Sequence, residues 1–467
     1  MAVSNLAHIF REYDIRGLAG SELSDALVRN LGITFAQHVA EQRSRNTSMR
    51  IVIGRDGRHS SPGLAQALAD GLAHGGAEVI DCGLVPTPAL YFASHHFDAD
   101  AAIMLTGSHN PPDYNGLKMV RDGRSVYGSE IQTLRQRLEA GVTPLPQAAE
   151  IRTGRILERY LQRILADYKP GRSLQVVLDC GNGVTGVVAP ELLNRLPGVA
   201  GEVLYPEVDG SFPNHHPDPT IPANLQALWV HMQETDAELG IAFDGDGDRI
   251  GALDENGKII WGDRLMILFA RQILATHPGA TIIGDVKCSQ LLFDAVAEAG
   301  GTPLMWKTGH SLVKSKMRET AAPLGGEMSG HLFFADRYLG YDDALYAAVR
   351  LIELVSSGPE TLSERLRNLP ESFSSPELRL ECADERKFQV MERIRMQLQN
   401  SGVPFSAIDG VRVSSEQGWW LLRVSNTQPA LVARIEANSR AHLQQLTQAL
   451  AELLAAEGIS LPEWQEA

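Results

Sequence analysis

The 467-residue sequence is poor in cysteine, and its few cysteines lie far apart. Cys82, Cys180, Cys288 and Cys382 form no C-x-x-C pair, so neither a disulfide framework nor a zinc site is expected from them. Free thiols fit a reducing compartment. We therefore expect a cytoplasmic protein.

The chain also lacks a basic excess and a long apolar run. It has 42 lysines and arginines against 57 aspartates and glutamates, whereas non-specific binding to nucleic acid needs a basic surface. The longest apolar runs are well short of the roughly 20 residues of a membrane span, and Met1 to Phe10 carry no signal-peptide pattern. We expect no nucleic-acid partner and no membrane partner. An anionic small substrate would need a local basic pocket.

What the chain does contain is an alternation of apolar runs, small polar loops and helical stretches. At roughly 100–200 residues per domain, its length indicates about three or four domains. Strand-then-loop patterns occur at 50–57, 101–108, 175–183, 240–244 and 281–287, and helical patterns at 64–74 and 129–139. This alternation predicts an α/β chain with mixed, mostly parallel sheets, whose active groups gather at the carboxyl ends of the strands.

The domain limits follow from linkers and turns. Residues 141–147 and 368–376 are proline-bearing and linker-like, and 254–258 reads as a hairpin turn. Beyond 376 the pattern changes to a strand (377–380), a helix (385–398), further strands and a helix (439–457), which predicts a smaller α+β lid. We expect domains at 1–150, 151–256, 257–370 and 371–467.

A serine nucleophile is suggested by the loop Thr106 to Asn110, which follows an apolar run. Ser-His-Asn alone is more often a capped turn. Here Pro111 and Pro112 stiffen the loop. Lys118, on the next apolar stretch, could neutralise a phosphoryl oxygen or move a proton. Ser108 is therefore the candidate nucleophile.

A second loop places Asp244, Asp246 and Asp248 at alternate positions with glycines between them. Three such carboxylates repel one another unless a cation lies among them. A calcium-binding EF-hand needs glycine where Arg249 stands, and helices where the flanks read as strands. Mg²⁺ with open positions for a phosphate oxygen is the natural choice; a solvated acidic turn is the remaining alternative.

Two further clusters of polar residues are weaker indications of a binding site. Gly326 to His331 offers carboxylate, hydroxyl and imidazole groups suited to sugar hydroxyls, and Arg423 to Pro429 offers a phosphate cradle, although each alone could be a polar turn. Basic groups on glycine-flanked loops also occur at 13–17, 54–58 and 307–311. The adjacent His215 and His216 cannot easily ligate one ion, so a structural role is favoured.

Together these loops resemble the α-D-phosphohexomutase superfamily, most closely its bacterial phosphomannomutase/phosphoglucomutase members. The four loops occur over essentially the whole chain in the family's order: phosphoserine, metal, sugar and phosphate. The resemblance implies three related α/β domains and a smaller C-terminal α+β domain around a central cleft.

The resemblance also implies roles for individual residues. Ser108 would be phosphorylated and would ligate Mg²⁺ together with Asp244, Asp246 and Asp248. Catalytic support would come from His109, Lys118, Arg16 and Arg249, with Lys118 and His109 as the candidates for proton transfer. Substrate would be bound by Tyr13, Lys287, His310, Glu327, Ser329, His331, Arg423, Ser425, Asn426 and Thr427.

The implied reaction interconverts the 1- and 6-phosphates of mannose and glucose through a phosphoserine and a 1,6-bisphosphate, with glucose 1,6-bisphosphate as activator. It would supply nucleotide-sugar precursors for exopolysaccharide and lipopolysaccharide. The alternatives are a phosphoglucosamine mutase, a phosphoserine-type phosphatase and a non-catalytic calcium-binding protein. Met328 argues against the first, because phosphoglucosamine mutases usually have glutamine at this position. Gln428 stands where relatives often have a small residue. We expect a monomer.

Overall fold

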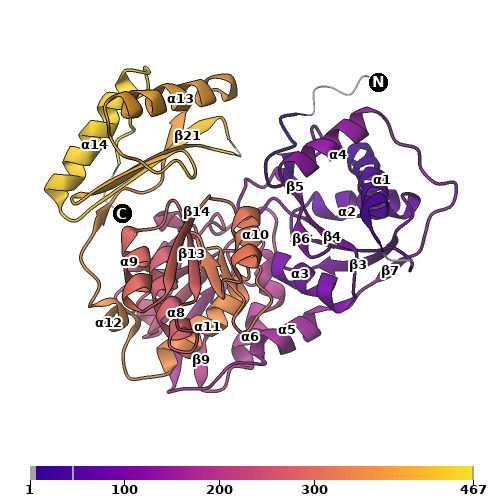
Figure 1. The fold of residues 1–467 in the computed structure, drawn as a ribbon. Helices are drawn as coiled ribbons and strands as arrows, with labels where there is room; N and C mark the ends of the chain where they lie inside the picture. The colour runs from indigo at the N-terminus through magenta and orange to yellow at the C-terminus, as the bar shows by residue number, and fades with distance from the viewer. Residues whose placement is uncertain (1–6, 45–46, 427, 465–467) are drawn as a thin grey trace.

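The computed structural model describes residues 7–44, 47–426 and 428–464. They form four units in chain order, each built on one sheet (Figure 1). Three units carry helices packed on mixed sheets, and the fourth, drawn in yellow, is a smaller antiparallel sheet under two helices. Among the described residues, no helix has the length and apolar character needed to cross a membrane.

The first unit holds a seven-stranded sheet of order β1-β5-β4-β2-β3-β7, with β6 beside β5. Its strands β2, β3, β4 and β7 run parallel, and β1 and β5 are antiparallel additions. The elements are β1 (Ile15–Leu18), α1 (Asp25–Gln42), β2 (Arg50–Arg55), α2 (Ser61–His74), β3 (Glu78–Leu84), α3 (Thr87–His96), β4 (Ala101–Leu105), β5 (Tyr114–Arg121), β6 (Arg124–Ser125), α4 (Ser129–Glu139) and β7 (Ile151–Thr153).

Strand β4 shows why the apolar run preceding Ser108 forms a central strand. All of its side chains are buried. Ile103 and Leu105 face one core, whereas Ala102 and Met104 face the core shared with the next units. A strand that is covered on both faces needs apolar residues at every position, and this one has them.

The second unit has the sheet β12-β11-β10-β8-β9. Its elements are α5 (Leu157–Leu165), β8 (Leu174–Asp179), α6 (Ala189–Asn194), β9 (Val199–Leu204), α7 (Gln226–Glu234), β10 (Leu239–Phe243), β11 (Ile250–Leu253) and β12 (Ile259–Ile260). Strands β11 and β12 pair antiparallel around the turn at 254–258, which confirms the predicted hairpin.

The third unit has the sheet β14-β13-β15-β16. Its elements are α8 (Gly262–Leu274), β13 (Thr281–Asp285), α9 (Gln290–Glu298), β14 (Thr302–Trp306), α10 (His310–Thr320), β15 (Leu324–Gly326), β16 (Leu332–Phe334), α11 (Ala344–Ser356) and α12 (Leu362–Leu366). Helix α11 also contacts β10 and β11, so the second and third units share one apolar core.

The fourth unit has a separate core and an antiparallel sheet, β17-β21-β20-β19, with β18 beside β21. Its elements are β17 (Phe373–Ser374), β18 (Leu378–Glu381), α13 (Asp384–Asn400), β19 (Val411–Ser415), β20 (Gly418–Val424), β21 (Ala430–Ala437) and α14 (Arg440–Ala455). The stretch expected to be a linker contains strand β17. This strand forms because its residues pair with the end of β21. The buried Arg412 joins this unit to the third by donating to the carbonyls of Val286 (2.7 Å) and Cys288 (2.9 Å).

The domain limits of 1–150, 151–256, 257–370 and 371–467 stay a prediction. The sheets themselves reach slightly further than two of those limits. Strand β7 adds residues 151–153 to the first sheet, and β12 adds 259–260 to the second. The loops expected to carry chemistry follow β4, β10, β13, β14 and β15, which places them at strand ends.

Candidate active site

The loop after β4 is held in place by an arginine from another segment. The Arg58 side chain is fully buried, and its guanidinium donates to the carbonyls of Ser108 (2.8 Å), Asn110 (2.6 Å), Tyr114 (2.9 Å) and Pro111. A Cβ on Gly107 would lie 2.4 Å from that guanidinium, so only glycine fits there. One buried guanidinium thus donates to four carbonyls and fixes the path of the loop.

Ser108 itself sits in the left-handed region with φ of 50°, which is uncommon for residues other than glycine. Its hydroxyl donates to Asp244 Oδ2 at 2.9 Å and lies 3.1 Å from His109 Nδ1. Burial, together with the nearby Arg249, lowers the pKa of His109 well below its ordinary value. The serine hydroxyl therefore lies between a carboxylate and a neutral imidazole.

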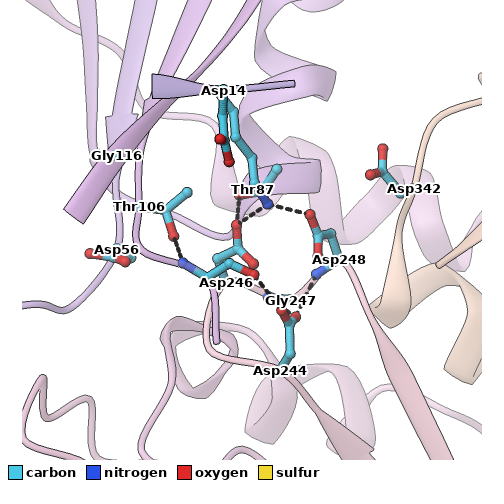
Figure 2. A network of polar contacts seen from close by, with 12 residues as sticks. Asp14, Asp56, Thr87, Thr106, Gly116, Asp244, Asp246, Gly247, Asp248 and Asp342 are labelled. Atoms are coloured by element: carbon cyan, nitrogen blue, oxygen red, sulfur yellow. Dashed lines mark hydrogen bonds and ion pairs between the residues drawn. The ribbon is translucent and has the colours of Figure 1, made fainter. Parts of the chain in front are cut away.

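The Asp-rich loop folds back on its first carboxylate. Asp244 Oδ1 accepts the backbone N–H groups of Gly247 (3.0 Å), Asp248 (3.0 Å) and Arg249 (3.1 Å). Gly247 has φ of 79°, and this conformation makes the tight return possible. Figure 2 shows the three carboxylates turned toward one another around this loop.

The three carboxylates fit a divalent cation. Asp244, Asp246 and Asp248 are fully buried, with ligand oxygens within 4.8 Å of one another. Asp246 Oδ1 has no hydrogen-bond partner. Burial and the two neighbouring carboxylates raise the pKa of Asp244 well above its ordinary value. Such crowding of hard oxygen ligands is relieved by a bound cation.

Lys118 reaches the same group from β5. Its ammonium contacts Asp246 Oδ2 at 2.7 Å and Asp248 Oδ2 at 2.5 Å. Burial disfavours the charged form, but the two carboxylates dominate and raise the pKa of Lys118 above its usual range. Arg16 lies at the other side of the serine loop, where it donates to Asn110 Oδ1 at 2.8 Å.

The turn between β15 and β16 places Glu327 and His331 in contact at 2.6 Å. Burial opposes ionisation of both groups, yet their mutual attraction prevails. The pKa of Glu327 falls to about 2, with His331 and Lys287 as its cationic partners, and the pKa of His331 rises to about 9 beside Asp248 and Glu327. Ser329 is half-buried next to them, with Oγ 3.4 Å from His331 Nδ1.

Side chains from the first, third and fourth units meet at Tyr13. Its hydroxyl donates to the Thr308 carbonyl at 2.8 Å and accepts from Asn426 Nδ2 at 2.6 Å. Arg423, at the end of β20, donates to Asp409 Oδ2 at 2.9 Å. Lys287 bridges the third and fourth units through Glu377 Oε2 at 2.9 Å. The fourth unit therefore contributes side chains to the same region as the first and third units.

Family models for this architecture match the chain in order and nearly end to end. The descriptions are phosphoglucomutase/phosphomannomutase, alpha/beta/alpha domains I (7–143), II (158–257) and III (261–373), and the C-terminal domain (377–453). The chain belongs to the phosphoglucomutase/phosphomannomutase family. The predicted family, and its fold of three α/β domains with a smaller C-terminal domain, are confirmed.

Individual members of the phosphoglucomutase/phosphomannomutase family are similar over nearly their full length. The chain is 44% identical over 438 residues to the phosphomannomutase/phosphoglucomutase of Pseudomonas putida, covering 94% of this chain and 93% of the relative. It is 43% identical over 461 residues to that of Pseudomonas aeruginosa, covering 98% and 97%. A solved structure of a family protein from Burkholderia thailandensis has a TM-score of 0.90 at 44% identity, covering 98% and 99%.

The structure of this family member brings nearly all the predicted site residues to one region. Ser108, His109, Lys118, Arg16 and Arg249 surround the Asp-rich loop. His310 stacks on His331 with ring centroids 5.7 Å apart. Thr427 lies outside the described residues. Gln428 is exposed, and its side chain accepts from Arg379 at 2.5 Å. The roles assigned to these residues stay predictions.

Two positioning groups of this phosphoglucomutase/phosphomannomutase chain were missed from the sequence. Arg58 was noted only as one basic group among several. Lys387 is buried in α13, and its ammonium donates to the carbonyls of Ser425 (2.8 Å) and Gln428 (3.0 Å), which shapes the phosphate loop. The available signal was its place on the buried stripe with Val390, Ile394 and Leu398.

The histidine pair has the structural role that the sequence favoured. His215 Nε2 contacts Asp179 Oδ2 at 3.0 Å, and His216 Nε2 contacts the carbonyl of His109. Neither histidine joins a group of three metal-ligand side chains among the described residues. His216 thus supports the serine loop of this family member from the second unit.

Proposed function

We propose that the chain is a phosphohexomutase that interconverts the 1- and 6-phosphates of mannose and glucose through a phosphoserine at Ser108 and a hexose 1,6-bisphosphate. One observation carries the proposal: the buried Ser108 hydroxyl lies 2.9 Å from a carboxylate of the metal-suited loop. A hydroxyl at a site for a hard cation is what phosphoryl transfer needs. Membership of the phosphoglucomutase/phosphomannomutase family supports the same reading.

Asp244, Asp246 and Asp248 would hold Mg²⁺, with a phosphate oxygen on Ser108 as a further ligand. When bound, the ion would neutralise charge on the transferring phosphoryl group. Lys118, beside Asp246 and Asp248, would place an ammonium against the phosphoryl oxygens. These groups are fixed before substrate arrives, so they stabilise developing charge with little rearrangement.

A neutral His109 suits proton transfer. Its lowered pKa leaves a free imidazole near pH 7, and its Nδ1 lies 3.1 Å from the Ser108 hydroxyl. We assign it the proton that is exchanged between the sugar hydroxyl and Ser108. Lys118 keeps its proton because its pKa is raised, so it acts as a hydrogen-bond donor.

The far end of the substrate would lie against the fourth unit. Arg423, Ser425, Asn426 and Thr427 would hold the phosphate that is not reacting, and Glu327 and Ser329 would bind sugar hydroxyls. Lys287, His310, His331 and Tyr13 would complete the pocket. The bisphosphate must turn end over end before Ser108 takes back the other phosphate, and closure of the fourth unit would exclude water meanwhile.

Glucose 1,6-bisphosphate would act as activator by restoring phosphate to a dephosphorylated Ser108. The product would feed nucleotide-sugar synthesis for exopolysaccharide and lipopolysaccharide. All four cysteines are free, which supports a reducing, cytoplasmic location. The site loops all come from one chain, which is compatible with an active monomer.

The test is a Mg²⁺-dependent coupled assay on glucose 1-phosphate and mannose 1-phosphate, with and without glucose 1,6-bisphosphate. We expect isomerisation of both sugars, stimulated by the bisphosphate, and loss of turnover in Ser108→Ala with substrate binding retained. Near-normal activity of that variant would contradict the phosphoserine. Release of phosphate without isomerisation would favour a phosphatase, and preference for glucosamine 1-phosphate a phosphoglucosamine mutase.

A further inference from the structure

A second group of metal-ligand atoms lies beside the Asp-rich loop. It consists of Asp248, His331 before β16, and Asp342 before α11, with ligand atoms within 4.8 Å of one another. Figure 2 shows Asp342 on the side of Asp248 that faces away from Asp246. The three side chains come from separate loops of the second and third units, so the fold brings them together.

Each carboxylate of this group has one oxygen anchored and the other without a hydrogen bond, and His331 is anchored through Nδ1. Asp248 Oδ2 accepts from Lys118 at 2.5 Å, and Asp342 Oδ1 accepts from Lys314 at 2.8 Å. His331 Nδ1 contacts Glu327 Oε2 at 2.6 Å. Metal-binding carboxylates and imidazoles are commonly oriented by such contacts on their other atom.

The remaining carboxylate oxygens face imidazole nitrogens at ion-pair distance, without a well-aligned hydrogen bond. Asp248 Oδ1 and Asp342 Oδ2 are buried and have no hydrogen-bond partner. His331 Nε2 lies 3.3 Å from Asp248 Oδ1, about the separation of neighbouring ligands around a tetrahedral zinc ion with bonds of about 2 Å. His310 Nδ1 lies 3.2 Å from Asp342 Oδ2, also without a hydrogen bond, and brings a second imidazole to the edge.

We propose that Asp248, His331 and Asp342 form a second divalent-metal site, suited to Zn²⁺, which shares only Asp248 with the site formed by Asp244, Asp246 and Asp248. An imidazole donor favours zinc over magnesium, which prefers oxygen ligands alone. Three protein ligands leave a position open for water, as in reactive zinc sites. Zinc binding would displace Arg249, whose Nε donates to His331 Nε2 at 3.2 Å, from that nitrogen.

The site has a consequence for the mutase that rests on the proposed function. Asp248 would belong to both metal sites, and His331 is proposed to bind the sugar phosphate. The region contains five buried carboxylates: Asp244, Asp246, Asp248, Glu327 and Asp342. They face the ammonium groups of Lys118 and Lys314 and the guanidinium of Arg249. Because the two sites share Asp248, zinc should weaken Mg²⁺ binding. Because His331 is also proposed to bind the sugar phosphate, zinc should inhibit turnover competitively with substrate.

The test is calorimetric titration of the full-length protein with ZnCl₂, without substrate, after bound metals have been stripped and Mg²⁺ has been restored to saturation. Wild type should bind one zinc ion. Asp342→Asn should weaken zinc binding by more than about 10-fold, since even loss of a group that supports a ligand costs that much. The matched control, Asp246→Asn, should lose Mg²⁺ and keep zinc. Unchanged zinc binding in Asp342→Asn, or its loss in Asp246→Asn, would overturn the proposal.

A second measurement tests the site in case the Asp342→Asn variant does not fold. Wild-type crystals soaked in ZnCl₂ should show anomalous density at the zinc edge between His331 and Asp342. Density confined to the Asp-rich loop, or none, would overturn the site. Because neither experiment uses substrate, a failed mutase assay would leave the zinc result intact, and absence of zinc would leave the mutase proposal intact.

Discussion

At the scale of single residues, the backbone around Ser108 depends on a side chain 50 positions earlier. Arg58 donates to the carbonyls of Ser108, Asn110, Pro111 and Tyr114 and to Asp56 Oδ2 at 3.1 Å. Ser108 holds an uncommon backbone conformation. Such conformations persist only where the surroundings enforce them, and Arg58 is the group that enforces this one.

We therefore predict that Arg58→Lys lowers kcat at least about 100-fold, because one ammonium cannot reproduce the planar fork of donors. Arg58→Ala should also lose roughly 3–5 kcal/mol of stability, since the Asp56 carboxylate would be left buried without its cation. Urea denaturation and initial rates measure both effects. Arg159→Lys, at an exposed position of α5, should change neither, and a fully active Arg58→Lys would refute the positioning role.

At the scale of elements, the sequence was most informative where its patterns are local. The helical pattern at 129–139 coincides with α4, and the apolar run at 101–105 coincides with β4. The strand β17 was missed because two residues inside a proline-bearing stretch carry no periodicity, and only pairing with β21 defines them. Long-range pairing of this kind decides short edge strands, and local patterns do not contain it.

The segment leading into β18 carries a pH-dependent link between the third and fourth units. Glu377 contacts Lys287 at 2.9 Å, and although burial opposes ionisation, the cations Lys287 and Arg379 lower the pKa of Glu377 to about 2. A carboxyl with a lowered folded-state pKa stabilises the fold above its unfolded pKa, near 4.5. That contribution is lost as the pH falls from about 4.5 toward 2.

We predict that Glu377→Gln destabilises the protein at pH 7 by up to roughly 3 kcal/mol, and that the difference from wild type shrinks steadily below pH 4.5. Urea denaturation at several pH values between 7 and 3.5 measures it. Glu381→Gln, exposed at the end of β18, is the control. A difference independent of pH would show that the Lys287 contact does not control the ionisation of Glu377.

At the scale of the whole molecule, the four loops of the candidate site could be predicted because each is a short sequence pattern, while the roles of their residues stay predictions. Lys387 and Asp342 are single polar residues that contact groups on other segments. The local sign of Lys387 is its place on the buried stripe of α13, which does not say what it contacts. The cores also differ in extent: one contains residues of the first, second and third units, whereas the fourth unit has its own.

We predict two calorimetric transitions, one of them belonging to the fourth unit, because its core is separate and its contacts with the third unit are partly polar. Leu450→Ala should lower only that transition, and Leu178→Ala only the other, each by about 2–5 kcal/mol. Leu450 lies in the fourth core and Leu178 in the shared one. A single transition lowered equally by both variants would refute the division.

The Arg58 contacts around the serine loop also limit which part of this site can be transferred to another protein. The loop's own five residues, 106–110, do not contain the arginine that fixes their shape, nor Asp56 that holds it. A designer who copies those residues onto another strand end would obtain an ordinary flexible turn. The transferable unit is discontinuous: the two strand ends of β2 and β4, with the buried Arg58–Asp56 ion pair supplied by the loop after β2.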